Sequence, residues 1–543
     1  MAGSRHAGNP VGEPGPRVRP ADHLHRYQGQ QPVRAEQGPL QRQEGPGDRE
    51  DLQPGPLHQV TGRRPPRQGR RPDAGAPPTT ARRASSAFSR ASRHTHTTTR
   101  RCFSMSERRR GGLTLSCLGL LPFGQAGAAG FIEDSKATLS LKNFYINQDV
   151  RNQDAPRSEE WGQAFFLDYK SGFTEGPVGF GLDVLAMHAI RLDGGGRSGK
   201  ADIERTPGGM FPLESNGKGK TDFGRVGVTG KLRFSKTEAR LGTLLPKMPV
   251  LVYNDGRLLP QLFHGAQITS NEIDNLSLTA GKIEHSTERN SGDSHGLSIG
   301  GANSGSRAQF SNEFYFAGAD YKATKDLLLQ YYYGNLRDFY KQHFFGLVHD
   351  WKLPVGSLKT DLRYFYSDSD GKNESASGRA EGYVSSGADG SSGEVDNNLW
   401  SAMFTYSLAG HALSLGYQKV SGDSDFPHIN LGSGRTLHLI TNGQIGKFAS
   451  AGENTWVAGY AYDFAAIGVP GLKTKLIYFS GDDIDAAGSD NKEWERNFRI
   501  DYAVQSGPLK GVGLAWLNAA TRGNDGRDLD ENRLMLTYSL PLL

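Results

Sequence analysis

The sequence predicts an all-β protein, an 18-stranded antiparallel transmembrane β-barrel that follows a disordered leader and a signal peptide. Three observations predict this fold. Apolar and polar residues alternate with period two along many segments, short turns alternate with long polar loops, and aromatic residues lie near the ends of the predicted strands. These patterns are typical of strands that turn one face to lipid and the other to water.

The composition excludes several other classes of protein. The chain has 543 residues, and it contains none of the repeated apolar stretches of about 20 residues that a helical membrane protein needs. Its two cysteines, Cys102 and Cys117, lie near the front. A disulfide framework or a cysteine-built metal site is therefore excluded for the rest of the chain.

The net charge of +5 averages two unlike parts of the chain. Residues 1–128 contain 21 Arg, no Lys and 9 acidic residues, whereas residues 129–543 contain 42 basic and 49 acidic residues. The larger part is acidic, so the overall basic balance does not indicate a nucleic-acid partner.

The front of the chain divides into two predicted segments. Residues 1–104 are rich in Arg, Pro, Gly and Gln, so they are expected to be disordered. Their lack of Lys favours translation of sequence upstream of the true start, with a real disordered tail as the alternative. Residues 105–128 have a basic start, an apolar run over 113–123 and the small-residue exit 126–128, the order of zones in a secretory signal peptide. Cleavage after Ala128 would leave residues 129–543 as the exported barrel.

Period-two segments follow one another along residues 129–543. In 225–234 one face carries Arg, Gly, Thr, Lys and Arg, and the other carries Val, Val, Gly, Leu and Phe. The same alternation occurs in 136–146, 161–169, 473–479 and 532–540. In the last of these, one face is Leu534, Leu536, Tyr538 and Leu540, which predicts a lipid-facing row.

The connections between these segments are of two kinds. Tight turns are predicted at 171–177, 323–326, 353–356, 409–410, 465–471 and 506–508, and long polar loops at 193–221, 286–306, 367–394, 421–437 and 480–492. Short periplasmic turns and long outer loops are typical of outer-membrane barrels. Each strand with its share of turn and loop takes about 22 to 24 residues, so residues 129–543 hold about 17 to 19 strands. Because barrels of this kind have an even number of strands, the prediction is 18.

A barrel of this size encloses an aqueous channel. The soluble alternative, a β-sandwich or β-helix, does not account for the aromatic residues near strand ends, where membrane interfaces place them. These residues are Trp161, Tyr169, Tyr331, Tyr332, Tyr364, Tyr366, Trp400, Tyr406, Tyr417, Trp456, Tyr460, Tyr462, Tyr478, Tyr502 and Tyr538.

Eight short motifs resemble those of the OprD-type substrate-specific porins of Gram-negative outer membranes, in consistent order from about residue 130 to the end. They are GFIEDS at 130–135, KNFY at 142–145, SGFTEG at 171–176, GFGLD at 179–183, RLLPQ at 257–261, GYQK at 416–419, GVPGL at 468–472 and VQSGP at 504–508. The resemblance implies a monomeric 18-stranded barrel in the outer membrane. In this family, inward loops narrow the lumen and a column of Arg and Lys guides small carboxylate-bearing solutes, such as amino acids or aromatic and aliphatic acids.

Two sets of cations are candidates for that column. The resemblance places five residues in the column or at its narrowest point: Lys142, Arg240, Arg257, Lys282 and Arg533. Strand parity adds six lumen-facing candidates: Arg225, Lys231, Arg233, Arg363, Lys475 and Arg499. Spaced cations can replace the hydration of a carboxylate by charge-assisted hydrogen bonds, provided that each binds weakly enough to release it.

The sequence departs from the family pattern in the penultimate strand. Column arginines are expected near Ala515 and Leu517, and both residues are apolar. The column is therefore expected to be interrupted, which favours an aromatic or more apolar acid as the solute.

Two other functions stay open at this stage, an outer-membrane barrel enzyme such as a hydrolase, and a structural or adhesive barrel with a plugged lumen. The string GLSIG at 296–300 matches the hydrolase nucleophile motif, but it lies in a Gly- and Ser-rich segment with no helix pattern after it. The histidines are scattered without metal-ligand spacing, so no catalytic residue, metal or cofactor is predicted. Expected partners are outer-membrane lipid and lipopolysaccharide, periplasmic chaperones and the barrel-assembly machinery.

Overall fold

The computed structural model describes residues 129–198, 204–300, 307–486, 491–524, 526 and 528–543. The predicted leader at 1–104 and signal peptide at 105–128 lie outside the described residues. Among the described residues, no helix is both long and apolar enough to cross a membrane.

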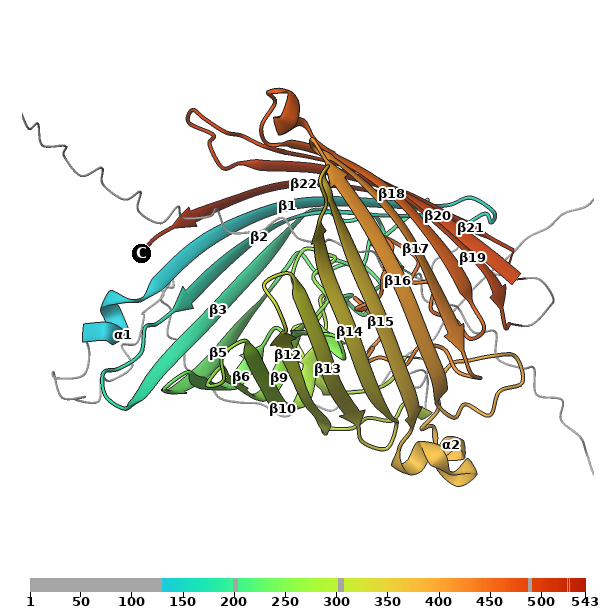
Figure 1. The fold of residues 1–543 in the computed structure, drawn as a ribbon. Helices are drawn as coiled ribbons and strands as arrows, with labels where there is room; N and C mark the ends of the chain where they lie inside the picture. Colours follow the sequence, from blue (N-terminus) through green and yellow to red (C-terminus); the bar gives the residue numbers. More distant parts are fainter. Residues whose placement is uncertain (1–128, 199–203, 301–306, 487–490, 525, 527) are drawn as a thin grey trace, which may run out of the picture. The chain divides into compact units, whose positions relative to one another are not determined.

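One antiparallel sheet forms the wall of the protein (Figure 1). The sheet contains 20 strands, of which β4 and β11 are short pieces beside the wall, so 18 strands make up the wall itself. The last wall strand pairs with the first, from Thr138↔Pro541 to Val150↔Leu529, and this pairing closes the barrel. The predicted fold class and strand number are confirmed.

The wall strands are long, mostly 9 to 16 residues. Their bounds are β1 Lys136–Val150, β2 Arg157–Lys170, β3 Val178–Asp193, β5 Asp222–Phe234, β6 Thr237–Leu244, β9 Leu262–Ser270, β10 Leu276–Thr287, β12 Phe314–Lys322, β13 Leu327–Leu336, β14 Tyr340–Lys352, β15 Ser357–Ser369, β16 Asp396–Leu408, β17 His411–Ser421, β18 Asn454–Asp463, β19 Leu472–Ile484, β20 Asn491–Ala503, β21 Gly513–Gly523 and β22 Leu529–Pro541.

The remaining elements are short. They are the helices α1 Ala129–Glu133, η2 Gly371–Glu374, α2 Ala376–Glu381 and η3 Phe464–Ile467, and the strands β4 Arg205–Thr206, β7 Lys247–Met248, β8 Leu251–Val252 and β11 Ser294–Gly296. β7 and β8 pair only with each other, inside the loop between β6 and β9.

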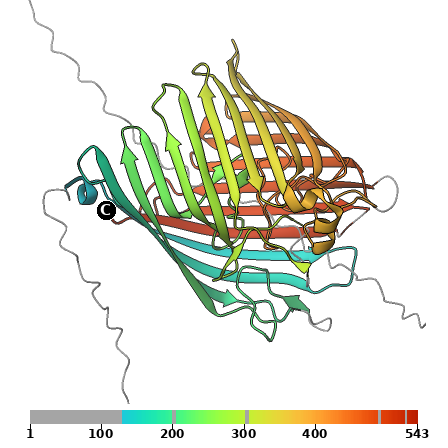
Figure 2. The same ribbon diagram turned by 90° about the horizontal axis from the view of Figure 1, so that it is seen from below.

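Short and long connections lie at opposite ends of the barrel. Helix α1 and the C-terminus lie at the end with the short turns (Figure 2), which the general pattern of these barrels assigns to the periplasm. One of these turns, Ala409-Gly410 between β16 and β17, has positive φ at both residues, 47° and 86°. That geometry matches the twist of a two-residue hairpin, and it favours glycine at the second position.

The two faces of each strand differ as the period-two pattern predicts. In β22, Leu534 and Leu536 are 49% and 43% exposed, whereas Arg533 and Met535 are 0% and 4% exposed. In β5, Val226, Val228, Leu232 and Phe234 are likewise exposed on one face. The exposed rows of neighbouring strands lie side by side, as in Tyr145↔Leu534 and Leu141↔Tyr538, so they form one continuous apolar outer face.

This sidedness gives a test on two adjacent residues of β17. Leu415 lies on the outer face, 56% exposed, and Ser414 lies on the inner face beside Thr405 and Gly459. We expect Leu415→Arg to lower the free energy of unfolding in phospholipid vesicles by about 2–4 kcal/mol, because it places a charge in hydrocarbon. Ser414→Arg should cost less than about 1 kcal/mol, since its charge meets water. Equal losses in a denaturant titration would contradict the assignment of the two faces.

Candidate functional site

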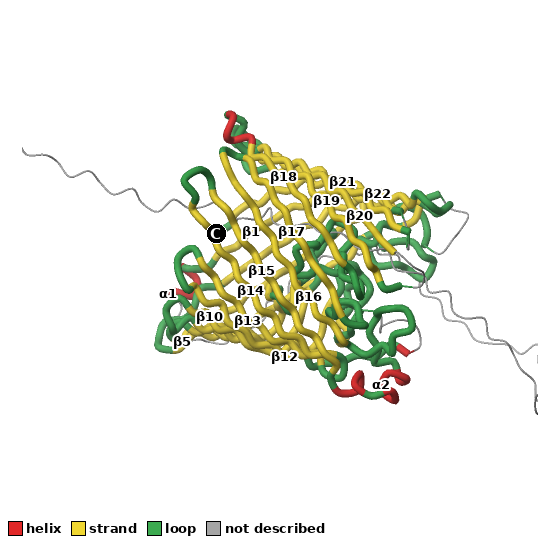
Figure 3. Tube along the Cα trace, turned by 45° about the vertical axis from the view of Figure 1, so that its right-hand side comes forward, coloured by secondary structure: helices red, strands yellow, loops and turns green. Residues whose placement is uncertain are grey.

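Three long loops turn back into the barrel and narrow it. They connect β6 to β9, β10 to β12 and β17 to β18. Figure 3 shows loop segments, in green, gathered toward the end of the wall where α2 lies. Leu258 and Leu259 of the first loop are fully buried in one apolar cluster with Phe144 and Ile146 of the inner wall. The lumen is therefore shaped by loops packed on strands.

A buried charge cluster lies where the β6–β9 loop meets β1 and β22. Lys142 of β1 donates to the backbone oxygen of Arg257, and Arg257 lies 3.7 Å from the Glu531 carboxylate. Arg533 pairs with the same carboxylate at 2.6 Å. Of these four side chains, Arg257, Glu531 and Arg533 are 0% exposed and Lys142 is 7% exposed. The sequence-predicted residues Arg257 and Arg533 are thus brought together around one acid, Glu531, and Lys142 holds the backbone of the same loop.

Arg225 of β5 holds two of the loops. Its guanidinium donates to the backbone oxygens of Glu288 and Pro260, each at 2.7 Å. Glu288 belongs to the β10–β12 loop and Pro260 to the β6–β9 loop. Arg225 faces the lumen as predicted, and its two shortest hydrogen bonds are to loop backbone.

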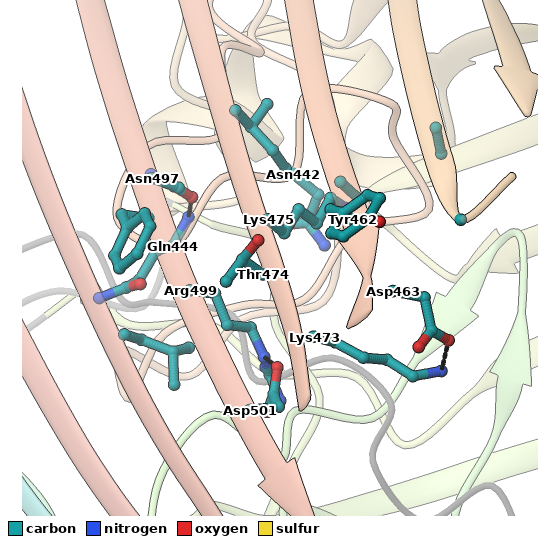
Figure 4. Close-up of a pocket in the computed structure, with 16 residues that line it drawn as sticks. Asn442, Gln444, Tyr462, Asp463, Lys473, Thr474, Lys475, Asn497, Arg499 and Asp501 are labelled. Atoms are coloured by element: carbon teal, nitrogen blue, oxygen red, sulfur yellow. Dashed lines mark hydrogen bonds and ion pairs between the residues drawn. The ribbon is translucent and has the colours of Figure 1, made fainter. Parts of the chain in front are cut away.

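A chamber lies between the inner wall and the β17–β18 loop (Figure 4). Its larger part is a cavity of about 460 Å³, and its lining includes Lys475, Arg499, Asp501 and Leu517 of the wall and Gln444 of the loop. A second cavity of about 240 Å³ shares Asn442, Ala461, Lys475 and Ile477 with it and reaches Arg363 on β15. Three of the predicted cations, Arg363, Lys475 and Arg499, therefore line one continuous space.

Several wall cations lie beside an acid two positions away on the same strand. Arg363 donates to both carboxylate oxygens of Asp361, at 2.8 and 2.7 Å. Arg499 donates to both oxygens of Asp501, each at 2.6 Å. Figure 4 shows the Arg499 guanidinium directed toward Asp501. Residues two apart on a strand point to the same face, so this spacing makes the chamber wall zwitterionic.

The parity candidates Lys231 and Arg233 and the resemblance candidate Arg240 line the inner wall near the short turns. Lys231 pairs with Asp183 at 2.6 Å, and Arg240 pairs with Glu238 at 2.5 Å. Arg233 lies over the Phe173 ring, with its guanidinium carbon 4.2 Å from the ring centroid. They share the inner face because Lys231 and Arg240 are register partners on β5 and β6.

Lys282 does not face the lumen. Lys282 of β10 pairs in register with Tyr315, which is 40% exposed. The adjacent register pair, Ile283 and Phe314, points to the opposite face and is fully buried. The Lys282 ammonium lies 3.0 Å from Glu284 and over the Tyr315 ring. This placement corrects the expectation that Lys282 belongs to the column, because its strand position has the parity of the outward residue Leu278.

The penultimate strand, β21, places apolar side chains on the inner face. Leu517 is 3% exposed and pairs in register with Arg499 on one side and Arg533 on the other. Ala515 lies between Asp501 and Met535. The apolar inner side chain of Leu517 thus separates Arg499 of β20 from Arg533 of β22.

Sequence reasoning missed the acids and the loop cations of the lumen. Glu531 lies two residues before Arg533, and residues two apart on a strand point to the same face. The lumenal position of Glu531 could therefore have been predicted from that of Arg533. Arg289 and Lys447 are fully buried in loops, where no strand period marks a residue as inward. Among the described residues, no group of three or more His, Cys, Asp or Glu side chains is arranged to hold a metal ion.

Comparison with known proteins agrees with this architecture. The family model described as outer membrane porin, OprD family, matches residues 129–542. The porin-like protein GalP of Pseudomonas putida is 36% identical over 435 residues, which cover 79% of this chain and 97% of GalP.

Solved structures from Pseudomonas aeruginosa have the same fold. OccK8 (OprE) is 55% identical with a TM-score of 0.71, and the match covers 76% of this chain and all of OccK8. OpdK, solved with vanillate, is 35% identical with a TM-score of 0.67 over 76% of this chain and all of OpdK. The chain therefore belongs to the OprD family of substrate-specific porins in the outer membrane of Gram-negative bacteria.

Proposed function

We propose that this porin is a passive diffusion channel for small carboxylate-bearing solutes, with aromatic acids as the favoured class. The observation that carries the proposal is the lumenal chamber, in which Arg363, Lys475 and Arg499 line one space together with the apolar side chains of Ile477, Leu439 and Leu517. Cations and apolar surface in one cavity suit a carboxylate on an aromatic or aliphatic body. We further propose that the channel has no enzymatic activity.

The paired acids make the chamber a weak binding site. A solute carboxylate that reaches Arg499 competes with Asp501, which already occupies the guanidinium with two hydrogen bonds. Charge-assisted hydrogen bonds from Arg499 replace the water that the solute carboxylate loses, and competition by Asp501 limits the resulting binding free energy. Weak, successive sites are what conduction requires, because a solute must leave as readily as it enters.

A relative supports the aromatic class. The structure of OpdK was solved with vanillate, which is an aromatic carboxylate. The inward apolar residues of β21 in this chain, Ala515 and Leu517, favour the same kind of solute over a strongly charged one.

The proposed set of solute-guiding cations omits Lys282. It retains Arg363, Lys475 and Arg499 in the chamber, Lys231, Arg233 and Arg240 near the short turns, and Lys142, Arg225, Arg257 and Arg533 at the loops. We also propose that cleavage after Ala128 releases the mature barrel, which is a monomer. Periplasmic chaperones and the barrel-assembly machinery bring it to the outer membrane, where lipid and lipopolysaccharide surround it.

The chamber cations can be tested by current block. In the Lys475→Gln and Arg499→Gln variants, we expect about tenfold weaker block of the ion current by benzoate, since each loses a cation and Arg499→Gln also leaves Asp501 to repel the anion. Block by uncharged benzamide should not change. The matched control is Lys282→Gln, which removes one cation from the outer face. If all three variants are blocked by benzoate like the parent protein, these cations do not guide carboxylates.

Two buried loop groups predict that anion preference depends on pH. Burial raises the pKa of the Glu288 carboxyl to about 7, against the opposing effect of Arg289 and Arg225. Burial lowers the pKa of the Lys447 ammonium to about 7, against the opposing effect of Glu495. Below this pH Glu288 is neutral and Lys447 is cationic; above it Glu288 is anionic and Lys447 is neutral. The lumen therefore becomes more negative as the pH rises through 7.

We expect the zero-current potential across a KCl gradient to shift toward lower anion preference between about pH 6 and pH 8. Glu288→Gln should make this shift smaller, because the Glu288 carboxyl then no longer contributes to it. The same zero-current potential at both ends of the range would contradict the assignment of these two groups.

A further inference from the structure

The turn at the tip of the β17–β18 loop, residues 441–447, lies deep in the lumen. We call it the lumenal turn. Thr441, Gln444, Ile445 and Lys447 of this turn are 0–4% exposed. Asn442 and Gln444 also line the chamber that contains Lys475 and Arg499. The position of the lumenal turn therefore sets the width of the chamber.

One carboxylate on the wall accepts hydrogen bonds from the backbone of this turn. Glu495 of β20 is 0% exposed, and its two oxygens accept hydrogen bonds from the backbone N–H groups of Ile445, at 3.0 Å, and of Gly446. Two residues further along the same face, Asn497 accepts a hydrogen bond from the N–H of Gln444 at 2.8 Å. Three successive N–H groups of the turn are thus held by one strand.

The turn is shaped to receive this carboxylate. A Cβ added at Gly443 would lie 2.8 Å from one Glu495 oxygen, and a Cβ added at Gly446 would lie 2.9 Å from the other. Neither glycine has a positive φ. The lack of a side chain at Gly443 and Gly446 therefore makes room for the Glu495 carboxylate, and the backbone conformation does not require glycine at either position.

The two neighbouring wall strands place no cation beside Glu495 at its own register position. The register partners of Glu495 are Phe479 on β19 and Thr521 on β21, neither of which is a cation. The cation that acts on Glu495 belongs to the turn, namely Lys447, whose ammonium donates to the backbone oxygen of Gly443 at 2.7 Å. Within the wall, the amide of Asn497 on the same strand also donates to Glu495, and the two backbone N–H groups that bind this buried acid are in the loop.

We propose that Glu495 is a positioning residue that clamps the lumenal turn against the wall, and that this clamp keeps the open channel steady. The energetic basis is that hydrogen bonds to an ionised acceptor in a buried site are stronger than those between neutral groups. Without the clamp, the turn moves between positions and the width of the chamber changes with it. The proposal concerns the passage of any ion, so it does not depend on which organic solute the channel carries.

The test uses variants on the two sides of the same contact. Glu495→Gln removes the charge, and Gly446→Ala leaves the carboxylate but pushes the turn away from it. In planar bilayers with KCl alone, we expect each variant to show current transitions about tenfold more often than the parent protein. The double variant should match the single variants, because both break one contact.

Two matched controls should keep the steady current of the parent protein. Asp168→Asn removes an inner-wall carboxylate of β2 that pairs with Lys170 near the short turns. Gly292→Ala adds a Cβ in the β10–β12 loop, where it would meet no atom within 4 Å.

Parent-like gating in both Glu495→Gln and Gly446→Ala, or additive effects in the double variant, would overturn the proposal. If Glu495→Gln does not fold, as judged by the heat-dependent shift of the barrel on a gel, Gly446→Ala decides alone: frequent transitions support the clamp and a steady current overturns it. Because no carboxylate solute is present, failure here leaves the proposed solute class untouched, and failure of the benzoate test leaves the clamp untouched.

Discussion

The structure depends on one constraint, which is that every backbone N–H and C=O group within lipid must be hydrogen-bonded inside the protein. A sheet satisfies this constraint only when it has no free edge. The pairing of the first strand, β1, with the last strand, β22, leaves no free edge in the barrel wall. Closure in turn gives each strand a lipid side and a lumen side. The exposed Leu534 and the buried Arg533, adjacent in sequence, are the direct result.

Charges on the inner side stabilise the loops as well as lining a path. Arg225, Lys142 and Arg533 all donate to backbone oxygens of lumenal loops, and Glu495 accepts from a loop backbone. Loop backbone that leaves its own sheet needs partners for its polar groups, because an unpaired buried group costs about 1–3 kcal/mol. Arg363, Lys475 and Arg499 instead line the chamber, where the proposed solute contacts lie.

Much of the wall could be predicted from sequence, because the side-chain period of a strand is visible in the residues themselves. The inner placement of Arg225, Lys231 and Arg233 follows from the apolar residues between them. Lys282 was assigned by resemblance, although the parity of Leu278 and Ala280 on the same strand already indicates the outer face. The loop predicted at 421–437 continues to residue 453, and its buried tip shows no strand period. Packing of a loop against a wall depends on contacts that are distant in sequence, so Ile445 and Lys447 carried no local sign of burial.

The most direct test of the proposed channel is the current through the purified protein in a planar lipid bilayer under KCl. A closed wall around a chamber lined by paired charges predicts discrete, ohmic steps of current that decrease when benzoate is added. A protein that is folded and inserted but carries no current would contradict a diffusion channel, because the lumen would then be plugged and the charges of the chamber could guide no solute.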